Sequence, residues 1–318
     1  MSLDVILIGG SGFIGSSICR RLQKNSLSFK ILDKKKSLDF SNETILCDIS
    51  KHNNLRESLQ PCKTLINLAA VHSDDASWEE YHETNIKGIE NIISLAEFHE
   101  INNIIFFSSV AVYGLNNINT NEESLVAPFN FYGTSKLEGE KLLSKWKSSK
   151  KDRNLQIIRP TAVFGPGNKG NVNRLIESIV KNKFLMIGSG SNKKSLAYVE
   201  NISHFTLSIL FSTSSSIYNY IDKPDFTMKE LVTFISLKLN KKILNFSMPY
   251  FIGLGFGYLI DLISYLSNKK FSLSSIRVKK FCSNSIFESN YIGKKYNPPY
   301  TIKEGLYKTI EADFSEES

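Results

Sequence analysis

The chain begins with a short apolar segment that runs directly into a glycine-rich loop. Asp4–Ile8 has the composition of a buried strand, the loop reads Gly9-Gly10-Ser11-Gly12-Phe13-Ile14-Gly15, and Phe13–Lys24 has helical periodicity. The loop matches GxGxxG from Gly10 and GxxGxxG from Gly9. Glycines permit a tight turn and a close backbone approach, and the N-terminus of the following helix attracts phosphate. A dinucleotide-binding unit is therefore expected at the start of the chain.

Predicted strands and helices alternate through the first half of the sequence. The further strands are predicted at Phe29–Leu32, Thr64–Leu68, Ile104–Ser108 and Leu155–Arg159, and the further helices at Trp78–His99 and Tyr132–Lys147. This order is typical of an α/β fold with a Rossmann-type doubly wound parallel sheet. The alternation breaks after about Gly165. We therefore predict a Rossmann domain over residues 1–165, with core strands that continue beyond it, and a smaller C-terminal substrate-binding lobe over residues 166–318.

Composition narrows the class of protein. Hydrophobic residues make up 42% of the chain and charged residues 22%, which is typical of a soluble globular protein. The four cysteines lack metal-type spacing, so we expect no metal site and a reducing, cytoplasmic location. The net charge is +8, but the basic residues are spread along the chain without aromatic interleaving. This distribution favours a phosphorylated small molecule over nucleic acid as the anionic partner.

Met248–Leu266 is apolar and rich in aromatic residues. It also contains three glycines and Asp261, which makes it a poor candidate for a membrane span. We expect no integral span, and two interpretations stay open: helices of the C-terminal lobe, or a peripheral contact with a membrane.

Asp33 lies eighteen positions after Gly15, at the end of the second predicted strand. A carboxylate there would accept hydrogen bonds from ribose hydroxyls and repel a 2′-phosphate, which favours NAD. Lys34-Lys-Lys36 follows directly and would suit that phosphate, so NADP stays possible.

Tyr132-Gly-Thr-Ser-Lys136 places a phenol and an ammonium one helical turn apart. The ammonium favours the phenolate, which makes the tyrosine a usable acid and base. The same spacing recurs at Tyr265…Lys269 and Tyr291…Lys295, so the spacing alone does not select the first copy.

Several further motifs occur in a characteristic order. They are Cys47-Asp48-Ile49, Asn67-Leu-Ala-Ala70, Asn85-Ile-Lys-Gly88, Phe107-Ser-Ser-Val-Ala-Val-Tyr-Gly114, Arg159-Pro-Thr-Ala-Val-Phe-Gly-Pro-Gly167, Lys194-Ser-Leu-Ala-Tyr-Val-Glu-Asn201 and Ser275-Ile-Arg-Val278. Together with the glycine loop and Tyr132…Lys136, they make the chain resemble an extended short-chain dehydrogenase/reductase of the nucleotide-sugar epimerase/dehydratase group. The resemblance is strong over about half of the chain and looser in the C-terminal lobe.

The resemblance implies roles for individual residues. Tyr132 would be the acid and base at a sugar hydroxyl, Lys136 would bind the nicotinamide ribose, and Ser109 would share the hydrogen bond of the reacting oxygen. The implied cofactor-binding residues are Gly9, Gly12, Phe13, Ile14, Gly15, Asp33, Asp48, Ile49, Ala69, Ala70, Asn85, Tyr132 and Lys136.

The resemblance also excludes one reaction. Related dehydratases carry an Asp-Glu pair directly after the serine position, where this chain has Val110 and Ala111. Neither side chain can move a proton, so elimination of water lacks its acid and its base.

The implied substrate is a nucleotide-diphosphate sugar, whose diphosphate requires cations. Lys194 and Arg277 lie at or near the positions where related enzymes hold the diphosphate. Asn168 and Asn173 are candidates for contacts with the sugar or the diphosphate, and His72 for a contact with the substrate. Asparagine in a Gly-Pro-Gly loop is as often a turn residue.

Three functions follow as hypotheses. The first is an NAD-dependent epimerase that transiently oxidises the sugar C4, resembles UDP-hexose 4-epimerases and serves the synthesis of surface polysaccharide precursors. The second is a reductase of 4-keto-6-deoxy nucleotide sugars that uses the same Ser109, Tyr132 and Lys136. The third is a non-catalytic NAD-binding regulator, against which the intact set of three residues argues. The resemblance also implies a homodimer formed through the long helices.

Overall fold

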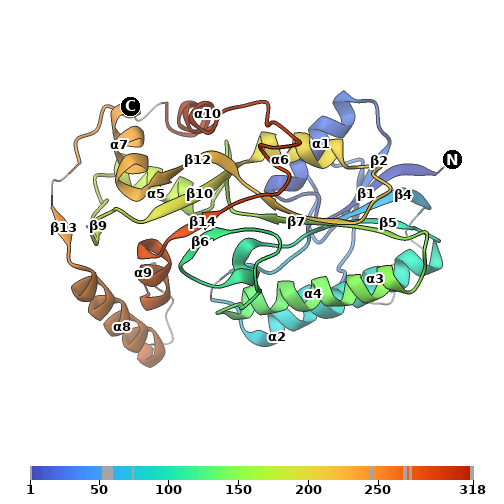
Figure 1. The fold of residues 1–318 in the computed structure, drawn as a ribbon, viewed down its shortest axis with the longest axis horizontal. Helices are drawn as coiled ribbons and strands as arrows, with labels where there is room; N and C mark the ends of the chain where they lie inside the picture. The colour runs from blue at the N-terminus through green and yellow to red at the C-terminus, as the bar shows by residue number, and fades with distance from the viewer. Residues whose placement is uncertain are drawn as a thin grey trace.

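A parallel sheet forms the centre of the N-terminal half of the molecule (Figure 1). The computed structural model describes residues 2–51, 60–73, 75–243, 246–267, 271 and 274–315. In spatial order, the strands are β11 (Ser216–Tyr220), β7 (Asn154–Pro160), β5 (Asn103–Phe107), β4 (Cys62–Asn67), β1 (Leu3–Ile8), β2 (Phe29–Asp33) and β3 (Thr44–Leu46). The chain winds outward from β1 through β2 and β3, then crosses to β4 on the other side of β1. This order confirms the predicted doubly wound sheet, although β3 was not predicted.

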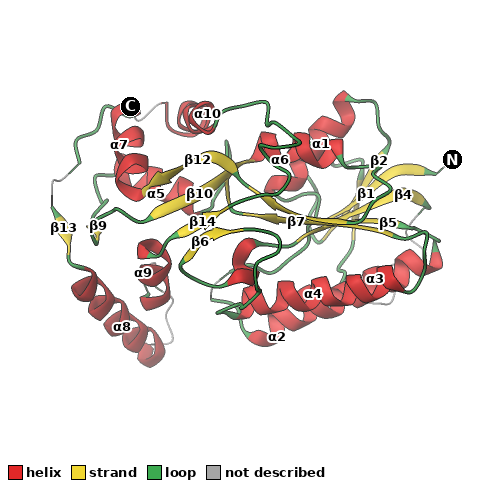
Figure 2. Ribbon diagram, in the orientation of Figure 1, coloured by secondary structure: helices red, strands yellow, loops and turns green. Residues whose placement is uncertain are grey.

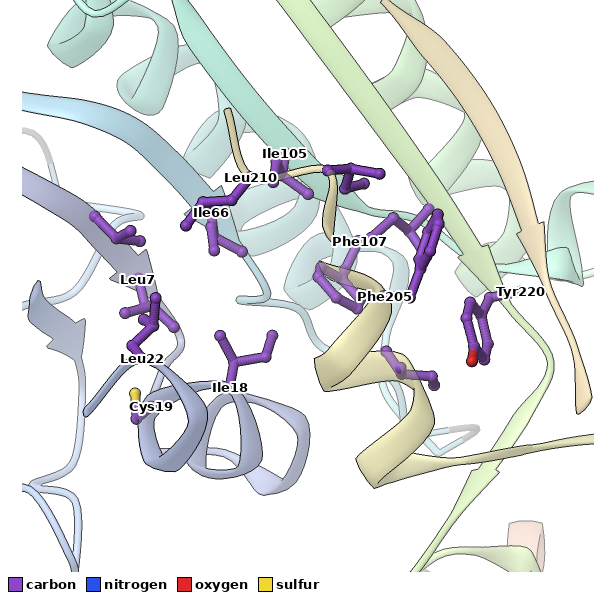
Figure 3. Close-up of a cluster of buried hydrophobic side chains, with 14 of the residues drawn as sticks. Leu7, Ile18, Cys19, Leu22, Ile66, Ile105, Phe107, Phe205, Leu210 and Tyr220 are labelled. Atoms are coloured by element: carbon purple, nitrogen blue, oxygen red, sulfur yellow. The ribbon is translucent and has the colours of Figure 1, made fainter. Parts of the chain in front are cut away.

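Helices cover both faces of this sheet. One face is covered by α1 (Phe13–Lys24) and α6 (Val199–Ser208), and the other by α2 (Trp78–Tyr81), the π-helix η2 (His82–Lys87), α3 (Gly88–Phe98) and α4 (Phe131–Ser148). Leu7 packs into the first cluster with Ile18 and Phe205, which Figure 3 shows, whereas Ile8 packs into the second. Side chains alternate along a strand, so neighbouring residues of β1 serve opposite cores.

The predicted helix over Trp78–His99 is interrupted by π-helical geometry. Ser77 begins α2 with a capping box that Glu80 completes, and the helix continues through η2 into α3. Single π-helical turns are often found at functional sites, and the buried Asn85 lies in this one.

The C-terminal part of the chain builds a second, mixed sheet. In spatial order its strands are β12 (Asp222–Thr227), β10 (Lys193–Tyr198), β14 (Ser285–Phe287) and β6 (Asn117–Thr120), with β8 (Ala162–Phe164) also paired to β10. Its core is shared with α5 (Asn171–Val180), α7 (Met228–Lys238) and α10 (Ile302–Phe314). The chain returns to the first sheet through α6 and β11, so the two sheets exchange segments on both sides of residue 165.

At the far end of this lobe lie β9 (Met186–Ile187), β13 (Ser247–Met248) and the helix pair α8 (Tyr250–Ser267) and α9 (Ser275–Cys282), as Figure 2 shows. Within the described residues, α8 is the one helix whose length and mean hydropathy of 1.3 would suit a membrane span. That result rests on length and composition alone, and 11% of the helix is buried. The apolar segment Met248–Leu266 is thus mainly one exposed helix.

Candidate active site

The glycine loop lies at the carboxyl end of β1 and leads into α1. Gly12 is the exposed N-cap residue, and in the part of the chain that the structure describes no side chain caps this helix. The first turn of α1 carries no acidic residue. Its N–H groups and the positive end of the helix dipole are therefore available to an anion. This arrangement fits the pyrophosphate of a dinucleotide.

Steric limits explain the glycines. Gly9 has φ +76°, and a Cβ there would lie 2.6 Å from the main-chain nitrogen of Ala69. A Cβ on Gly15 would lie 2.5 Å from the carbonyl oxygen of Gly10, and a Cβ on Gly10 would lie 2.9 Å from the Cβ of Leu7. Glycine is therefore needed at positions 9, 10 and 15. These positions include the first glycine of both predicted motifs, GxxGxxG from Gly9 and GxGxxG from Gly10, and the last glycine that the two motifs share.

Asp33 ends β2 and joins it to the loop. Its carboxylate accepts hydrogen bonds from the main-chain N–H groups of Ser11 (3.1 Å) and Lys35 (3.1 Å). Lys34 forms an ion pair with Asp48 at 3.2 Å. The structure thus brings together Asp33, the lysine run and Asp48 at the end of the site predicted for the adenosine half.

The remaining predicted cofactor residues surround the same edge of the sheet. Ile49 is buried against Gly88, and its carbonyl accepts a hydrogen bond from Asn91 at 2.7 Å. Ala69 donates its N–H to Asn67 and begins the loop that includes Ala70. The close approach of Gly9 to Ala69 places the loop after β4 beside the glycine loop.

Asn85 joins that loop to α4. Its Oδ1 accepts from the N–H of Val71 at 2.8 Å, and its Nδ2 donates to the carbonyl of Val71 and to Ser135 Oγ, both at 2.9 Å. The amide is therefore engaged with protein atoms on both sides of the site. Its observed contacts are those of a positioning residue.

Lys136 is held at the end of β5. Its Nζ donates to the carbonyl of Phe107 at 2.7 Å, and the side chain is buried. Burial lowers the pKa of this ammonium to about 7, while the negative charge of Glu140 opposes that shift. Asn130 fixes the start of α4 by accepting the N–H of Gly133 at 2.9 Å.

The segments that carry Ser109 and Tyr132 lie side by side, because α4 packs very closely against the segment after β5. Ser109 is the N-cap of the 3₁₀-helix η3 (Val110–Tyr113), where its Oγ accepts the N–H of Ala111 at 3.1 Å. A Cβ on Gly133 would lie 2.5 Å from the carbonyl of Ala111. Tyr132 is half-buried, with its ring 6.3 Å from that of Tyr81. The predicted Ser109, Tyr132 and Lys136 therefore converge at one edge of the sheet.

The other two tyrosine–lysine pairs lie elsewhere. Tyr265 is 85% exposed on α8, and Lys269 lies outside the described residues. Tyr291 packs against the rings of Phe205 and Tyr218.

Sequence reasoning missed a buried polar network beneath Lys136. Glu140 accepts hydrogen bonds from Ser108 (2.5 Å) and from Arg159 (2.9 and 2.5 Å), and Arg159 also donates to Tyr113 at 2.6 Å. Tyr113 in turn donates to Asn219 at 2.9 Å. The signals were an acidic residue one turn after Lys136 and an arginine inside an otherwise apolar strand.

Both cations predicted for the diphosphate lie at α9: Arg277 belongs to this helix, and Lys194 contacts its carboxyl end. Lys194 Nζ donates to the carbonyls of Lys280 and Ser283, both at 2.7 Å, and burial lowers its pKa to about 8. Arg277 forms an ion pair with Asp75 at 3.1 Å. Both are tied to protein groups, and their contact with a substrate stays a prediction.

The other predicted substrate residues also have protein partners. Asn168 donates to the carbonyl of Val163 at 2.8 Å and accepts from Gly170, which is a turn arrangement. Asn173 is buried and donates to Asp313 at 2.8 Å. His72 is exposed, with Nδ1 3.5 Å from the carbonyl of Ala70. Of these three, His72 is the one in the loop after β4, which also carries the predicted cofactor residues Ala69 and Ala70.

Comparison with known proteins decides the family. Residues 5–219 match the model of the NAD dependent epimerase/dehydratase family, which covers more than half of the chain. The chain belongs to this family. Membership confirms the predicted extended short-chain dehydrogenase/reductase class, with NAD as the cofactor and an enzymatic role.

Two curated relatives align with almost the whole chain. An N-acetyl-α-D-glucosaminyl-diphospho-ditrans,octacis-undecaprenol 4-epimerase of Escherichia coli O157:H7 is 40% identical, over 99% of this chain and 96% of the relative. A UDP-glucose 4-epimerase of Vibrio cholerae is 26% identical, over 98% and 96%. The solved structure of a Thermotoga maritima UDP-glucose 4-epimerase with UDP-glucose superimposes with a TM-score of 0.80 at 18% identity, over 99% of this chain and 100% of that one. The solved structure supports the fold.

Proposed function

We propose that this family member is an NAD-dependent 4-epimerase of a hexose carried on a diphosphate, in the synthesis of surface polysaccharide precursors. The observation that carries the proposal is the 40% identity to a 4-epimerase across 99% of the chain. The convergence of Ser109, Tyr132 and Lys136 supports it. Val110 and Ala111, which cannot transfer protons, argue against a dehydratase.

The chain's own residues account for the proton transfers. Tyr132 removes the proton of the C4 hydroxyl and later returns it, and Ser109 holds the reacting oxygen by a hydrogen bond. The Lys136 ammonium stabilises the Tyr132 phenolate electrostatically. NAD, when bound, supplies reversible hydride transfer at C4. Epimerisation requires that the hydride returns to the opposite face of the sugar.

Two carriers of the diphosphate are consistent with the relatives. The sequence resemblance implies a nucleoside, and the Vibrio cholerae relative is a UDP-glucose 4-epimerase. The more similar Escherichia coli relative acts, by its name, on a sugar linked to undecaprenol through a diphosphate. We propose the polyprenyl carrier, because identity to that relative is much higher over an equal share of the chain.

The test is direct. Purified protein is incubated, without added NAD(H), with polyprenyl-diphospho-N-acetylglucosamine and separately with UDP-N-acetylglucosamine, and the sugars released by acid are identified. We expect the C4 epimer from the polyprenyl substrate and bound NAD in the purified protein. Epimerisation of the UDP-sugar alone would contradict the proposed polyprenyl carrier, but it would agree with the proposed 4-epimerase reaction.

A reductase would behave differently. A reductase would consume NAD(P)H in strict proportion to a 4-keto sugar. That observation would overturn the proposal of an epimerase. Replacing Tyr132→Phe separates an enzyme from a binding protein: turnover should fall by a factor of about 10²–10⁴, with NAD retained. An unchanged rate would contradict the assigned acid and base.

We further propose a homodimer and a cytoplasmic location. The exposed apolar residues Phe98 and Phe131 on the long helices support a contact between copies, and the thiols of all four cysteines are free. Light scattering of the purified protein tests the dimer.

A further inference from the structure

α8 has two sides of opposite character. Gly253, Gly257 and Asp261 lie four residues apart and form one stripe of the helix. A Cβ on Gly253 would lie 2.6 Å from Ile187, and one on Gly257 would lie 2.8 Å from Ser275. The Asp261 carboxylate accepts the N–H of Ser275 at 3.2 Å. This stripe fixes the helix on the lobe.

The other side of α8 exposes a continuous set of large apolar side chains. Phe251 is 82% exposed, Tyr265 85% and Leu266 74%. The full set, here called the α8 apolar face, is Phe251, Ile252, Phe256, Tyr258, Leu259, Leu262, Ile263, Tyr265 and Leu266. By helical periodicity these positions lie away from the glycine stripe, except Tyr265, which follows Asp261 by four residues near the exposed end of the helix. Soluble monomers rarely expose so large an apolar surface without a partner.

Charge around this face identifies the partner. α8 and α9 together carry three basic residues, Arg277, Lys279 and Lys280, and one acidic residue, Asp261, which is hydrogen-bonded to the lobe. On α9, Lys279 lies over the ring of Tyr258 at 5.3 Å. The whole chain carries a net charge of +8. An apolar helix face bordered by cations and tyrosines suits the surface of a bilayer that contains anionic lipids.

We propose that the α8 apolar face docks the protein on the surface of an anionic phospholipid membrane. α8 lies in the interface and does not cross the bilayer, because crossing would break the contacts of Gly253, Gly257 and Asp261 with the lobe. The helix projects from the end of the molecule, so its outer face is accessible to a flat surface (Figure 1).

The docking helix is connected to the proposed diphosphate site. α8 packs on α9, whose last carbonyls accept the hydrogen bonds of Lys194 and whose Arg277 reaches Asp75 in the loop after β4. Membrane docking would therefore bring this end of the site close to lipid headgroups. A substrate with a polyprenyl tail would present its diphosphate at that level. This last step rests on the proposed function, whereas membrane binding itself does not.

Vesicle flotation tests the docking without turnover. The full chain is mixed with vesicles of phosphatidylethanolamine and phosphatidylglycerol, and with vesicles of phosphatidylcholine as the neutral comparison. We expect binding to the anionic vesicles, weakened by salt. The variant Phe251→Ser/Leu262→Ser/Leu266→Ser should bind at least about tenfold more weakly, since three inserted side chains are lost. Leu237→Ser removes a 75%-exposed leucine from α7 and is the matched control, expected to bind like the unmodified chain.

Three results would overturn the proposal. The first is failure of the flotation test itself: either the unmodified protein floats with neither kind of vesicle, or the triple variant floats as well as the unmodified protein. The second is resistance of the bound protein to alkaline extraction, which would mean a spanning helix. The third is conversion of a dimer to a monomer by the triple variant without any vesicle binding, which would make the α8 apolar face a contact between copies. Loss of epimerase activity on both substrates with intact flotation would contradict only the proposed function.

Discussion

Glu140 and Arg159 form a buried ion pair close to Lys136, with Nε 2.9 Å from Oε1 and Nη2 2.5 Å from Oε2. Both side chains are 5% exposed. Glu140 stands one turn after Lys136 on α4, and Ser108 beside it precedes Ser109 in the chain. The pair therefore links α4, the end of β5 and β7 next to the candidate catalytic residues.

Glu140→Gln should destabilise the protein by about 3 kcal/mol, because it leaves the Arg159 guanidinium buried without its countercharge. Chemical denaturation measures the free energy of unfolding. Glu138→Gln is the control on the same helix, where an exposed pair with Lys141 is lost, and it should change stability by less than about 0.5 kcal/mol. Equal effects of the two substitutions would contradict the importance of the buried pair.

Gly133→Ala should lower kcat by about tenfold to a hundredfold, because the added methyl would push α4 away from Ala111 and separate Tyr132 from Ser109. Steady-state kinetics on the proposed substrate provides the measurement. Gly255→Ala makes the same chemical change on α8, where nothing lies within 4 Å of the added carbon. It should leave kcat unchanged and stabilise the helix slightly. An unaffected kcat in Gly133→Ala would mean that the close packing does not position the site.

Asp222 should make stability depend on pH. Burial raises the pKa of Asp222 from 3.8 to about 7, although the N–H of Tyr198 (2.6 Å) and the amide of Asn201 (3.0 Å) donate to its carboxylate. At pH values between these two pKa values, Asp222 keeps its proton in the folded state and releases it in the unfolded state. The contribution of Asp222 to stability is therefore complete below about pH 4 and is lost as the pH rises through about 7.

Denaturation of the unmodified chain and of Asp222→Asn across this pH range measures the effect. The unmodified protein should lose stability relative to the variant with a slope of at most about 1.4 kcal/mol per pH unit. Parallel curves for the two proteins would show that Asp222 does not titrate in this range.

Asp33→Ser should shift cofactor preference toward NADP by at least about tenfold, since it removes the carboxylate that repels a 2′-phosphate while Lys34, Lys35 and Lys36 remain. Calorimetric titration of the two cofactors into protein from which bound NAD has been removed compares their affinities. Asp39→Ser removes a carboxylate that pairs with Arg20 on the surface, and it should leave the preference unchanged. An equal shift of cofactor preference in both variants would mean that the loss of any carboxylate has this effect, and it would contradict a specific role of Asp33.

The Rossmann-type sheet could be predicted because its signals are local. A strand of apolar residues, a glycine loop and a periodic helix each depend on neighbouring residues, and Phe13–Lys24 was predicted with the bounds that the structure has. β3 was missed because a three-residue edge strand is too short to carry a pattern. The π-helical turn around Asn85 was missed for a related reason, since nothing in its composition differs from an α-helix.

By itself, the sequence determined the cofactor-binding unit, the alternation of strands and helices in the first half of the chain, and Ser109, Tyr132 and Lys136 as candidates, because spacing along the chain carries that information. The tertiary structure decided that Tyr132…Lys136 is the pair that lies at the end of β5, since Lys136 is buried and donates to the carbonyl of Phe107. It also decided that Glu140 and Arg159 neutralise each other and that α8 keeps its apolar side exposed. Pairing of charges and burial of a helix face depend on what segments distant in sequence pack against, and local composition does not record those contacts.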